Sequence, residues 1–422
     1  MLVRREVLAG IATLPLAGSA FADSALIGRS CWDDLTKRGL YLPLLHEARG
    51  FKARGLQIRA QIFALVGDED AAFRTMTTGG EAAATAPDLT GAQSERALDA
   101  IAREARTRQI VILNEAHHIS RCRAFALEVA LLLRSQGFEV FAAEALNDDG
   151  EPNAAKILNS GGPVTTNFGL YPDDPVYAEL MRGAGAAGYR FAAYEARYDQ
   201  MSGEYGDAAI VAREDAEADN FVANILKANP LARVFVYCGY DHVRKTPQRG
   251  VAWFAARLKA KTGIDPLCIT QTAGVPPPDP ALENAALKAI LDHFDPQEPI
   301  VISDGQGHPV VVSEAMDPAP FDGSVDLSVF HPRLPYVAGR PGWLAKAPGR
   351  KAAPYRFAMP ASADGLLQAI PAAAAMNANA VPADQFPVRA GTHEAMFLVK
   401  YGDYEVRFET NDGRRALGTL MA

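Results

Sequence analysis

The sequence predicts an α/β fold in which helices flank a mainly parallel sheet, with an N-terminal helical hairpin and a small C-terminal antiparallel β domain. Two patterns in the 422 residues lead to this prediction. Between residues 96 and 275, short β-branched and aromatic runs alternate with segments of helical length, which is typical of βαβ units. Beyond a proline-rich boundary at 275–280, strands alternate with glycine-containing turns, the pattern of antiparallel hairpins.

Residues 1–22 have the features of an export signal. Arg4 and Arg5 open a modestly apolar stretch, and small residues flank Phe21, which predicts cleavage after Ala22. The paired arginines followed by an apolar pair favour the twin-arginine type, although an ordinary secretory signal also begins with basic residues. We therefore expect a periplasmic or secreted protein.

The composition excludes some classes of partner. The formal net charge is −8, whereas a nucleic-acid-binding protein usually presents a basic face. No run after residue 22 has the roughly 20 apolar residues of a membrane span. We therefore expect the ligand to be a small-molecule or peptide substrate. The sequence does not indicate a partner for the C-terminal β domain.

The chain has four cysteines, Cys31, Cys122, Cys238 and Cys268. Export permits disulfides, and Cys238 and Cys268 belong to consecutive expected strands, so they could be close. Buried unpaired thiols that pack as small apolar groups are the alternative. The sequence alone does not choose a pairing.

The first region, residues 23–95, is expected to be a helical hairpin with a linker. Two apolar sets between residues 31 and 76 are separated by Gly50 and Gly55. Such spacing indicates two amphipathic helices that pack on the main domain. A stretch rich in glycine, alanine and threonine at 77–90 is typical of a linker.

The second region, residues 96–275, is expected to be the α/β domain. Its predicted strands are 110–113, 139–143, 189–194, 233–238 and 266–270, and its predicted helices are 98–106, 121–135, 176–184, 209–228 and 251–261. The third region, residues 276–422, begins with a helix at 281–294 and then becomes β-rich. Gly402-Asp403 and Asp412-Gly413 are good hairpin signals between its last strands.

Ionisable residues follow four of the expected parallel strands. Glu115 and His117 follow the first, Glu144 the second, Glu195 the third, and Asp241 with His242 the fourth. Parallel strands bring their carboxyl ends to one edge of the sheet, where ligands bind in open α/β folds. Glu195 taken alone is more simply an acid of an ordinary loop. Glu115, His117 and His242 together indicate a functional site.

Two chemistries fit these residues. In one, His117 or His242 is a general base that activates water, and a carboxylate orients it. In the other, Glu115, His117, Glu144 and His242 bind a divalent metal, for which zinc, manganese or iron suits mixed nitrogen and oxygen ligands. His118 is adjacent to His117, so we expect only one of the two to face the site.

Arg213 is a further candidate. It shares a helix face with Asn220 and Asn224, because spacings of seven and four residues repeat on one side of a helix. An arginine near clustered carboxylates balances their charge or binds an anionic substrate group. The alternative is a solvated first turn of a helix, in which acids are favoured.

The order of these motifs resembles a known superfamily, the Tiki/TraB, ChaN-like and erythromycin-esterase-like group. The matching segments are Asn114-Glu115-Ala116-His117, Glu144, Arg213-Glu214 and Gly239-Tyr240-Asp241-His242. The resemblance covers about residues 96–275, and Asn114 stands where the family usually has glycine. It implies an α/β fold whose site uses the two histidines, the glutamates and the arginine. Members include metal-dependent proteases, esterases with a histidine base, and haem- or iron-binding proteins.

The leading hypothesis is an exported hydrolase of ester or amide bonds, with Glu115, His117, Glu144, Arg213 and His242 as catalytic residues, with or without a metal. The first alternative is a haem- or iron-binding uptake protein, in which the histidines or Tyr194, Tyr237 and Tyr240 would ligate iron. The second alternative is a non-catalytic binding scaffold.

Overall fold

The computed structural model describes residues 27–51, 55–77, 86–146, 153–201, 207–248, 250–312 and 323–422. The predicted export signal lies outside these residues, as does most of the predicted linker, at 78–85. No helix in the described ranges is long and apolar enough to cross a membrane.

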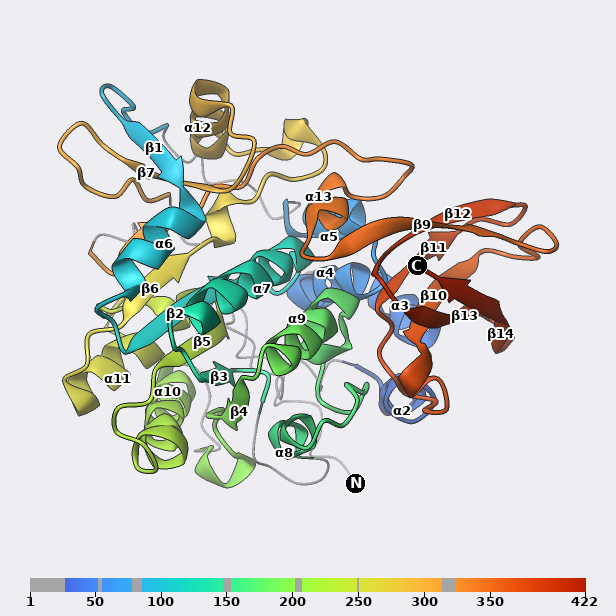
Figure 1. Ribbon diagram of the computed structural model, residues 1–422, viewed down its shortest axis with the longest axis horizontal. Coiled ribbons are helices and arrows are strands. Elements are labelled where there is room, and N and C mark those ends of the chain that lie inside the picture. The colour runs from blue at the N-terminus through green and yellow to red at the C-terminus, as the bar shows by residue number, and fades with distance from the viewer. Residues whose placement is uncertain are drawn as a thin grey trace, which may run out of the picture.

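A six-stranded parallel sheet forms the centre of the molecule (Figure 1). Its strands run in the order β4-β3-β5-β2-β6-β8, and every neighbouring pair is parallel. They are β2 (Ile110–Glu115), β3 (Val140–Ala143), β4 (Arg190–Ala193), β5 (Val234–Gly239), β6 (Leu267–Thr270) and β8 (Leu327–Ser328). The predicted α/β fold is confirmed.

Helices cover both faces of this sheet. On one face, Phe125 and Leu180 pack against strand residues such as Leu113. On the other, Phe221 and Phe254 pack against residues such as Ile112. The first face carries α6 (Ala97–Ala105), α7 (Ser120–Ser135), α8 (Ala154–Asn159) and α9 (Pro175–Ala186), and the second carries α10 (Asp207–Phe221), which continues as a π-helical turn, and α11 (Phe254–Thr262). Burial of both faces explains why the strands are continuous apolar runs.

The N-terminal region consists of four short helices rather than the predicted hairpin. They are α2 (Arg29–Arg38), α3 (Leu42–Arg49), α4 (Leu56–Leu65) and α5 (Glu69–Thr77). Gly39 ends the first helix in a left-handed conformation with φ 63°, which glycine adopts without steric cost. The core of these helices includes Leu366 of the C-terminal sheet. The helices therefore pack on the C-terminal part of the chain as well as on the α/β domain (Figure 1).

The C-terminal part is antiparallel, as predicted. One sheet has the order β11-β10-β13-β14, and a second pairs β9 with β12. Their bounds are β9 (Arg350–Arg356), β10 (Gly365–Pro371), β11 (Asp384–Val388), β12 (Glu394–Lys400), β13 (Asp403–Thr410) and β14 (Gly413–Met421). The helices α12 (Ala285–Phe294) and α13 (Gly342–Lys346) precede these strands.

Two strand pairings cross the boundaries that the sequence suggested at residues 95 and 275. The strand β1 (Gln93–Arg96) pairs with β7 (Ile300–Ser303). The strand β8 joins the parallel sheet beside β6, although it lies far beyond the proline-rich stretch. The prolines interrupt regular structure locally, but the chain then returns to the same sheet.

The four cysteines are unpaired. Cys238 lies in β5 and Cys268 in β6, and β2 runs between these two strands. The two strands are consecutive in the chain but are not neighbours in the sheet. The alternative of buried thiols therefore describes Cys122, Cys238 and Cys268, while Cys31 is partly exposed.

Candidate functional site

The carboxyl edge of the sheet gathers the predicted side chains. Glu115 ends β2, and the chain leads from the strands to His117, Glu144, Glu195 and, in a short helical turn at Tyr240–Val243, His242. The helix α10 adds Arg213, Glu214 and Glu217 from the second face. Each of these residues is at least 95% buried. Two connected groups result, one around His117 and one around His242.

Glu115 is held by a dense set of donors. Arg123 of α7 donates from Nε and Nη2 to its two oxygens, each at 2.8 Å, and the Tyr237 hydroxyl donates at 2.7 Å. Burial alone raises the pKa of Glu115, but the charge and hydrogen bonds of Arg123 outweigh it and lower the pKa to about 2. Glu115 is therefore ionised at neutral pH and does not act as a proton-transferring acid there.

His117 is oriented by this carboxylate. Its Nδ1 lies 2.9 Å from Glu115 Oε1, and because the carboxylate accepts, Nδ1 carries a proton; in the neutral form of the ring the lone pair is then on Nε2. Tyr171 stacks on the ring at 4.0 Å between centroids, and Tyr240 meets it edge-on at 5.0 Å. The imidazole is therefore held in one tautomer and one plane.

Gly239 leaves the space that His117 occupies. A Cβ atom at this position would lie 2.4 Å from His117 Nε2 and 3.1 Å from Glu144 Oε2. Real Cβ atoms do not approach other atoms so closely, so a side chain here would displace His117. The same geometry places Nε2 of His117 close to the Glu144 carboxylate.

Asn114, which stands where the superfamily that the sequence resembles usually has glycine, stabilises the turn after β5. Its side-chain amide donates to the carbonyl oxygen of Tyr240 at 2.8 Å, and its oxygen accepts from the N–H of Gln271 at 2.9 Å. Tyr240 has a φ of 34°, an uncommon conformation for a residue with a side chain. Asn114 thus links the ends of β2, β5 and β6 next to the site.

Glu144 connects the two groups. Its Oε2 accepts from the N–H of Gly239 at 2.5 Å, and its Oε1 accepts from Arg213 at 2.9 Å and lies 3.6 Å from His242 Nε2. Burial raises the pKa of Glu144, but the neighbouring His242, His117 and Arg213 charges lower it to about 2. Glu144 is the shared anion between the two histidines.

Arg213 is the hub of the second group. It donates to both oxygens of Glu195, at 3.0 and 2.6 Å, pairs with Glu217 at 3.0 Å, and places Nη1 3.1 Å from His242 Nε2. The interpretation of Glu195 as an ordinary loop acid was wrong, because its carboxylate is buried against Arg213. Burial raises the pKa of Glu195 to about 8, with Glu217 and Glu144 adding to the rise and Arg213 opposing it.

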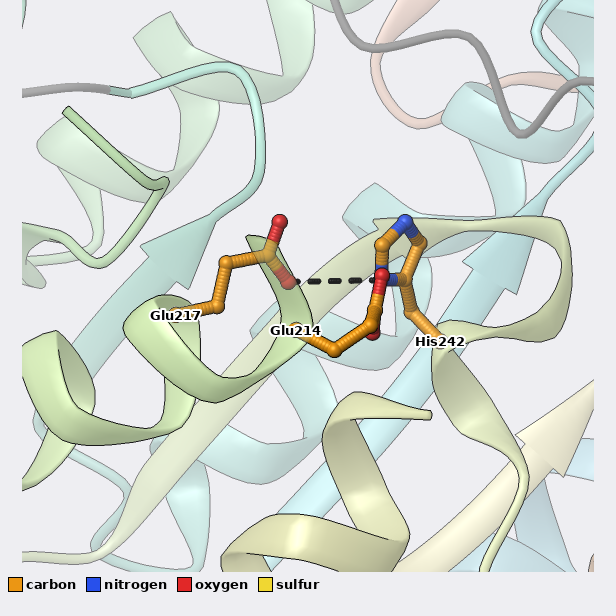
Figure 2. Close-up of side chains that lie close together, drawn as sticks. All are labelled: Glu214, Glu217 and His242. Atoms are coloured by element: carbon orange, nitrogen blue, oxygen red, sulfur yellow. Dashed lines mark hydrogen bonds and ion pairs between the residues drawn. The ribbon is translucent and has the colours of Figure 1, made fainter. Parts of the chain in front are cut away.

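Glu214, Glu217 and His242 converge on one point (Figure 2). Nδ1 of His242 lies 3.0 Å from Glu214 Oε2 and 3.3 Å from Glu217 Oε2. One ligand atom from each of the three residues lies within 4.8 Å of the others, so the group could hold a metal ion. Of the predicted metal ligands Glu115, His117, Glu144 and His242, this group contains His242 alone. The oxygens of Glu115 already accept hydrogen bonds from Arg123, His117 and Tyr237, so they are not available to a metal ion.

Several residues of the site escaped the sequence analysis. Glu217 follows Glu214 by three positions on one helix face, a signal that was present in the sequence. Asp174 caps α9 before Pro175 and binds Arg123 Nη1 at 2.8 Å, and an acid followed by proline is a typical helix start. Nothing in the local sequence marks Arg123, whose role depends on how α7 docks on β2.

The helix face proposed for Arg213 does point inward, but Arg213 lies within α10, which begins at Asp207, and not in its first turn. Asn220 donates to the carbonyl oxygen of Glu195 at 2.9 Å, and Asn224 to that of Ala193 at 3.0 Å. Both asparagines thus tie α10 to the end of β4.

His118 belongs to neither of the two groups; its ring meets Phe73 edge-on, with 5.8 Å between the centroids. It lines a cavity of about 40 Å³ at the junction of the N-terminal helices, the α/β domain and the C-terminal part, together with Glu69, Asp174, Arg340 and Trp343. Burial, with the nearby charge of His117, lowers the pKa of His118 to about 3. This imidazole is neutral at ordinary pH.

Comparisons with known proteins found distant structural similarity alone. No family model matches the chain, and no curated protein matches it. Among solved structures it is similar to a chain described as bacterial protein toxins, at 19% identity and a TM-score of 0.29, covering 48% of this chain and 43% of that one. It is also similar to RRSP, a MARTX toxin effector domain from Vibrio vulnificus CMCP6, at 20% identity and a TM-score of 0.29. This match covers 52% of this chain and 44% of that one. This chain thus spans less than half of each of those chains, and at these values the similarity says nothing about its function.

Proposed function

We propose that the chain is an exported hydrolase in which His117 is the general base. The observation that carries the proposal is the buried pair of Glu115 and His117, with Nδ1 2.9 Å from the carboxylate. A carboxylate on one ring nitrogen fixes the tautomer and stabilises the imidazolium that forms when the other nitrogen takes a proton. Nε2 of His117 is the nitrogen that would take it.

Water is the nucleophile that fits this site. Burial raises the pKa of the Cys122 thiol to about 12 and that of Cys238 well above its usual value, so neither supplies a thiolate. The hydroxyl of Ser120 donates to Asp174 at 2.5 Å instead of to a histidine. A water molecule between Nε2 of His117 and Glu144 would donate one proton to each, and attack an ester or amide carbonyl after losing one to His117.

The other predicted catalytic residues have supporting roles in this proposal. Glu144 orients the water, and Arg213 holds Glu144 at 2.9 Å.

The test is a panel of ester and peptide substrates with the exported form of the chain. His117→Gln should lower kcat/KM by about 100-fold or more, the usual contribution of a positioned general base, and Glu115→Gln should lower it as well. His308→Gln, at an exposed histidine, is the control and should retain full activity. Activity that survives His117→Gln would exclude this residue as the base.

The same sample separates the alternatives. A Soret band on addition of hemin, lost in His117→Gln or Tyr240→Phe, would favour a haem-binding uptake protein. Assays with a chelator and with added zinc, manganese or iron show whether hydrolysis needs a divalent ion. Absence of both hydrolysis and hemin binding would favour a binding scaffold.

A further inference from the structure

The group around His242 has an excess of negative charge. Glu144, Glu195, Glu214 and Glu217 all form ion pairs with Arg213. Among the described residues in contact with these carboxylates, the cations are Arg213 and, when protonated, His242. Near neutral pH Glu195, with its pKa of about 8, holds a proton. Glu144, Glu214 and Glu217 then face Arg213 and a protonated His242, and one negative charge is uncompensated. Buried charge of this kind is costly unless a counter-charge is present.

In the neighbouring group around His117 every oxygen of Glu115 and Asp174 accepts a hydrogen bond. Glu115 and Asp174 share Arg123, at 2.8 Å each, and Glu115 also accepts from His117 and Tyr237. Ser120 donates to Asp174 as well. The two groups lie at the same sheet edge with the same burial, so the difference is specific to the carboxylates of α10.

Unsatisfied oxygen atoms mark where the missing charge belongs. Glu214 Oε1 and both carboxylate oxygens of Glu217 are buried and accept no well-directed hydrogen bond, although Glu217 Oε1 lies 3.0 Å from Arg213 Nε and Oε2 lies 3.3 Å from His242 Nδ1. The hydroxyl of Tyr194 is also buried without a partner, and it interacts electrostatically with Glu217. Buried polar atoms are nearly always satisfied in native proteins, and exceptions indicate a missing ion or water. The incompletely satisfied oxygens of Glu214 and Glu217 beside His242 therefore indicate a ligand.

We propose that a divalent transition-metal ion binds between Glu214, Glu217 and Nδ1 of His242 (Figure 2). Two carboxylates and one imidazole are a mixed oxygen and nitrogen set that suits zinc, manganese or iron. Ligand atoms about 2 Å from an ion lie no more than about 4 Å apart, and the three donors already lie within 4.8 Å. Small side-chain rotations would complete the set, with water as a further ligand near Tyr194.

Binding of the ion rearranges one proton. The proton on Nδ1 of His242 leaves to solvent or moves to Nε2, and the lone pair of Nδ1 binds the ion. Nε2 then carries a hydrogen that faces Glu144 Oε1, 3.6 Å away. Many metal sites have this arrangement, in which a carboxylate accepts from the second nitrogen of a metal-binding histidine. Arg213 Nη1, 3.1 Å from the same nitrogen, is also a donor, so this contact lengthens in the metal-bound form.

The ion has a positioning role. It lies on the Nδ1 side of His242, whereas Glu144 and His117 lie on the other side. Because it binds Glu214 and Glu217 of α10 together with His242 of the turn after β5, the ion fixes the position of His242. The contact between His242 and Glu144 then fixes the position of Glu144. The inference rests on charge and geometry, and it does not depend on the chain being a hydrolase.

Metal analysis of the wild-type chain tests the site directly. The sample is stripped with a chelator, loaded separately with zinc, manganese and iron(II), and desalted before metal content and thermal unfolding are measured. We expect about one ion per chain for at least one metal, and a higher Tm in its presence. If none of the three binds stoichiometrically or raises the Tm, the proposal is wrong.

The variant Glu217→Gln sharpens the test. With metal, its Tm should be below that of wild type and its affinity at least tenfold weaker. With chelator, its Tm should equal or exceed that of wild type, because an uncompensated charge has been removed. Asp219→Asn is the matched control, since Asp219 is an exposed acid of the same helix that pairs with Lys261.

If wild type binds no ion, and Glu217→Gln has a higher Tm than wild type both with metal and with chelator, the metal proposal is wrong. Protons then neutralise the carboxylates around His242. Should Glu217→Gln fail to fold, the electron paramagnetic resonance spectrum of bound Mn²⁺ in wild type decides on its own. These readouts are metal content and stability, so they remain interpretable whether or not His117→Gln affects hydrolysis.

Discussion

The N–H of Gly239 donates to Oε2 of Glu144 over 2.5 Å. This bond joins the end of β5 to the residue that follows β3, and these two strands are neighbours in the sheet. It directs the Glu144 carboxylate toward the space above Gly239, which His117 also occupies. The mutual position of Glu144 and His117 therefore depends on a residue without a side chain.

Gly239→Ala should abolish most activity. The new Cβ would lie 2.3 Å from His117 Cε1, so the imidazole must move out of its plane, and overpacking of this kind costs about 1–3 kcal/mol. Hydrolysis and urea unfolding measure the two effects. Gly185→Ala in α9 is the control, because its Cβ meets Phe191 at an ordinary 3.5 Å and alanine favours the helix. Equal activity of the Gly239→Ala variant and wild type would contradict the packing described for His117.

Arg123→Met should destabilise the fold strongly. Arg123 is 1% exposed and pairs with Glu115 and Asp174, and removal of one partner from a buried ion pair costs about 3–5 kcal/mol. Denaturant unfolding gives the free energy. Arg103→Met, at a half-exposed arginine that pairs with Glu95, should cost no more than about 1 kcal/mol. Similar losses in the two variants would mean that the buried pairing is not what stabilises this part of the fold.

The carboxyl group of Glu409 should make stability decrease as the pH rises. Burial raises its pKa to about 7, although the N–H of Leu42 donates to it at 2.7 Å. The folded state then holds a proton that the unfolded state, with a pKa near 4.5, has lost. Stability from this group is present below about pH 4.5 and is lost as the pH rises to about 7.

Glu409→Gln should therefore flatten this part of the pH profile. At pH 8 the variant should be more stable than wild type, and near pH 4.5 the two should be similar. Urea unfolding at several pH values measures the profile. Glu394→Gln, at an exposed residue of β12 that pairs with Arg356, should leave the profile unchanged. A wild-type profile that is flat between pH 5 and 8, with no difference in the variant, would rule out the raised pKa.

Thiol titration should distinguish the cysteines. Cys31 is partly exposed, whereas the other three cysteines are buried, and burial raises the pKa of Cys122 to about 12. In the native protein we expect Cys31 alone to react rapidly with a thiol reagent at pH 8. All four should react after unfolding without reductant, and two or fewer reactive thiols would instead reveal a disulfide.

The strand pattern was sufficient to predict the edge at which the site lies. Glu115, His117, Glu144 and His242 follow buried apolar runs, and parallel strands bring such positions together whatever their order in the sheet. The N-terminal region was correctly predicted to be helical, but its described residues form four helices in place of the two that were predicted. Gly39 and Gly67 end helices within stretches whose apolar pattern looks continuous.

The sequence by itself thus determined the fold class and the residues at the carboxyl edge of the sheet, because both follow from local periodicity and the geometry of parallel strands. The tertiary structure alone decided how these residues are paired. Arg123 faces Glu115 because α7 docks over β2, whereas Glu144 and Glu195 share Arg213 with two acids of α10. The contacts of Arg123 with Glu115 and of Arg213 with Glu144 join residues 8 and 69 positions apart in the chain, and helix docking, which local sequence patterns do not encode, sets them. The carboxylates beside His117 are therefore fully hydrogen-bonded, whereas Glu214 and Glu217 beside His242 are not, which is the basis for the proposed base and the proposed metal site.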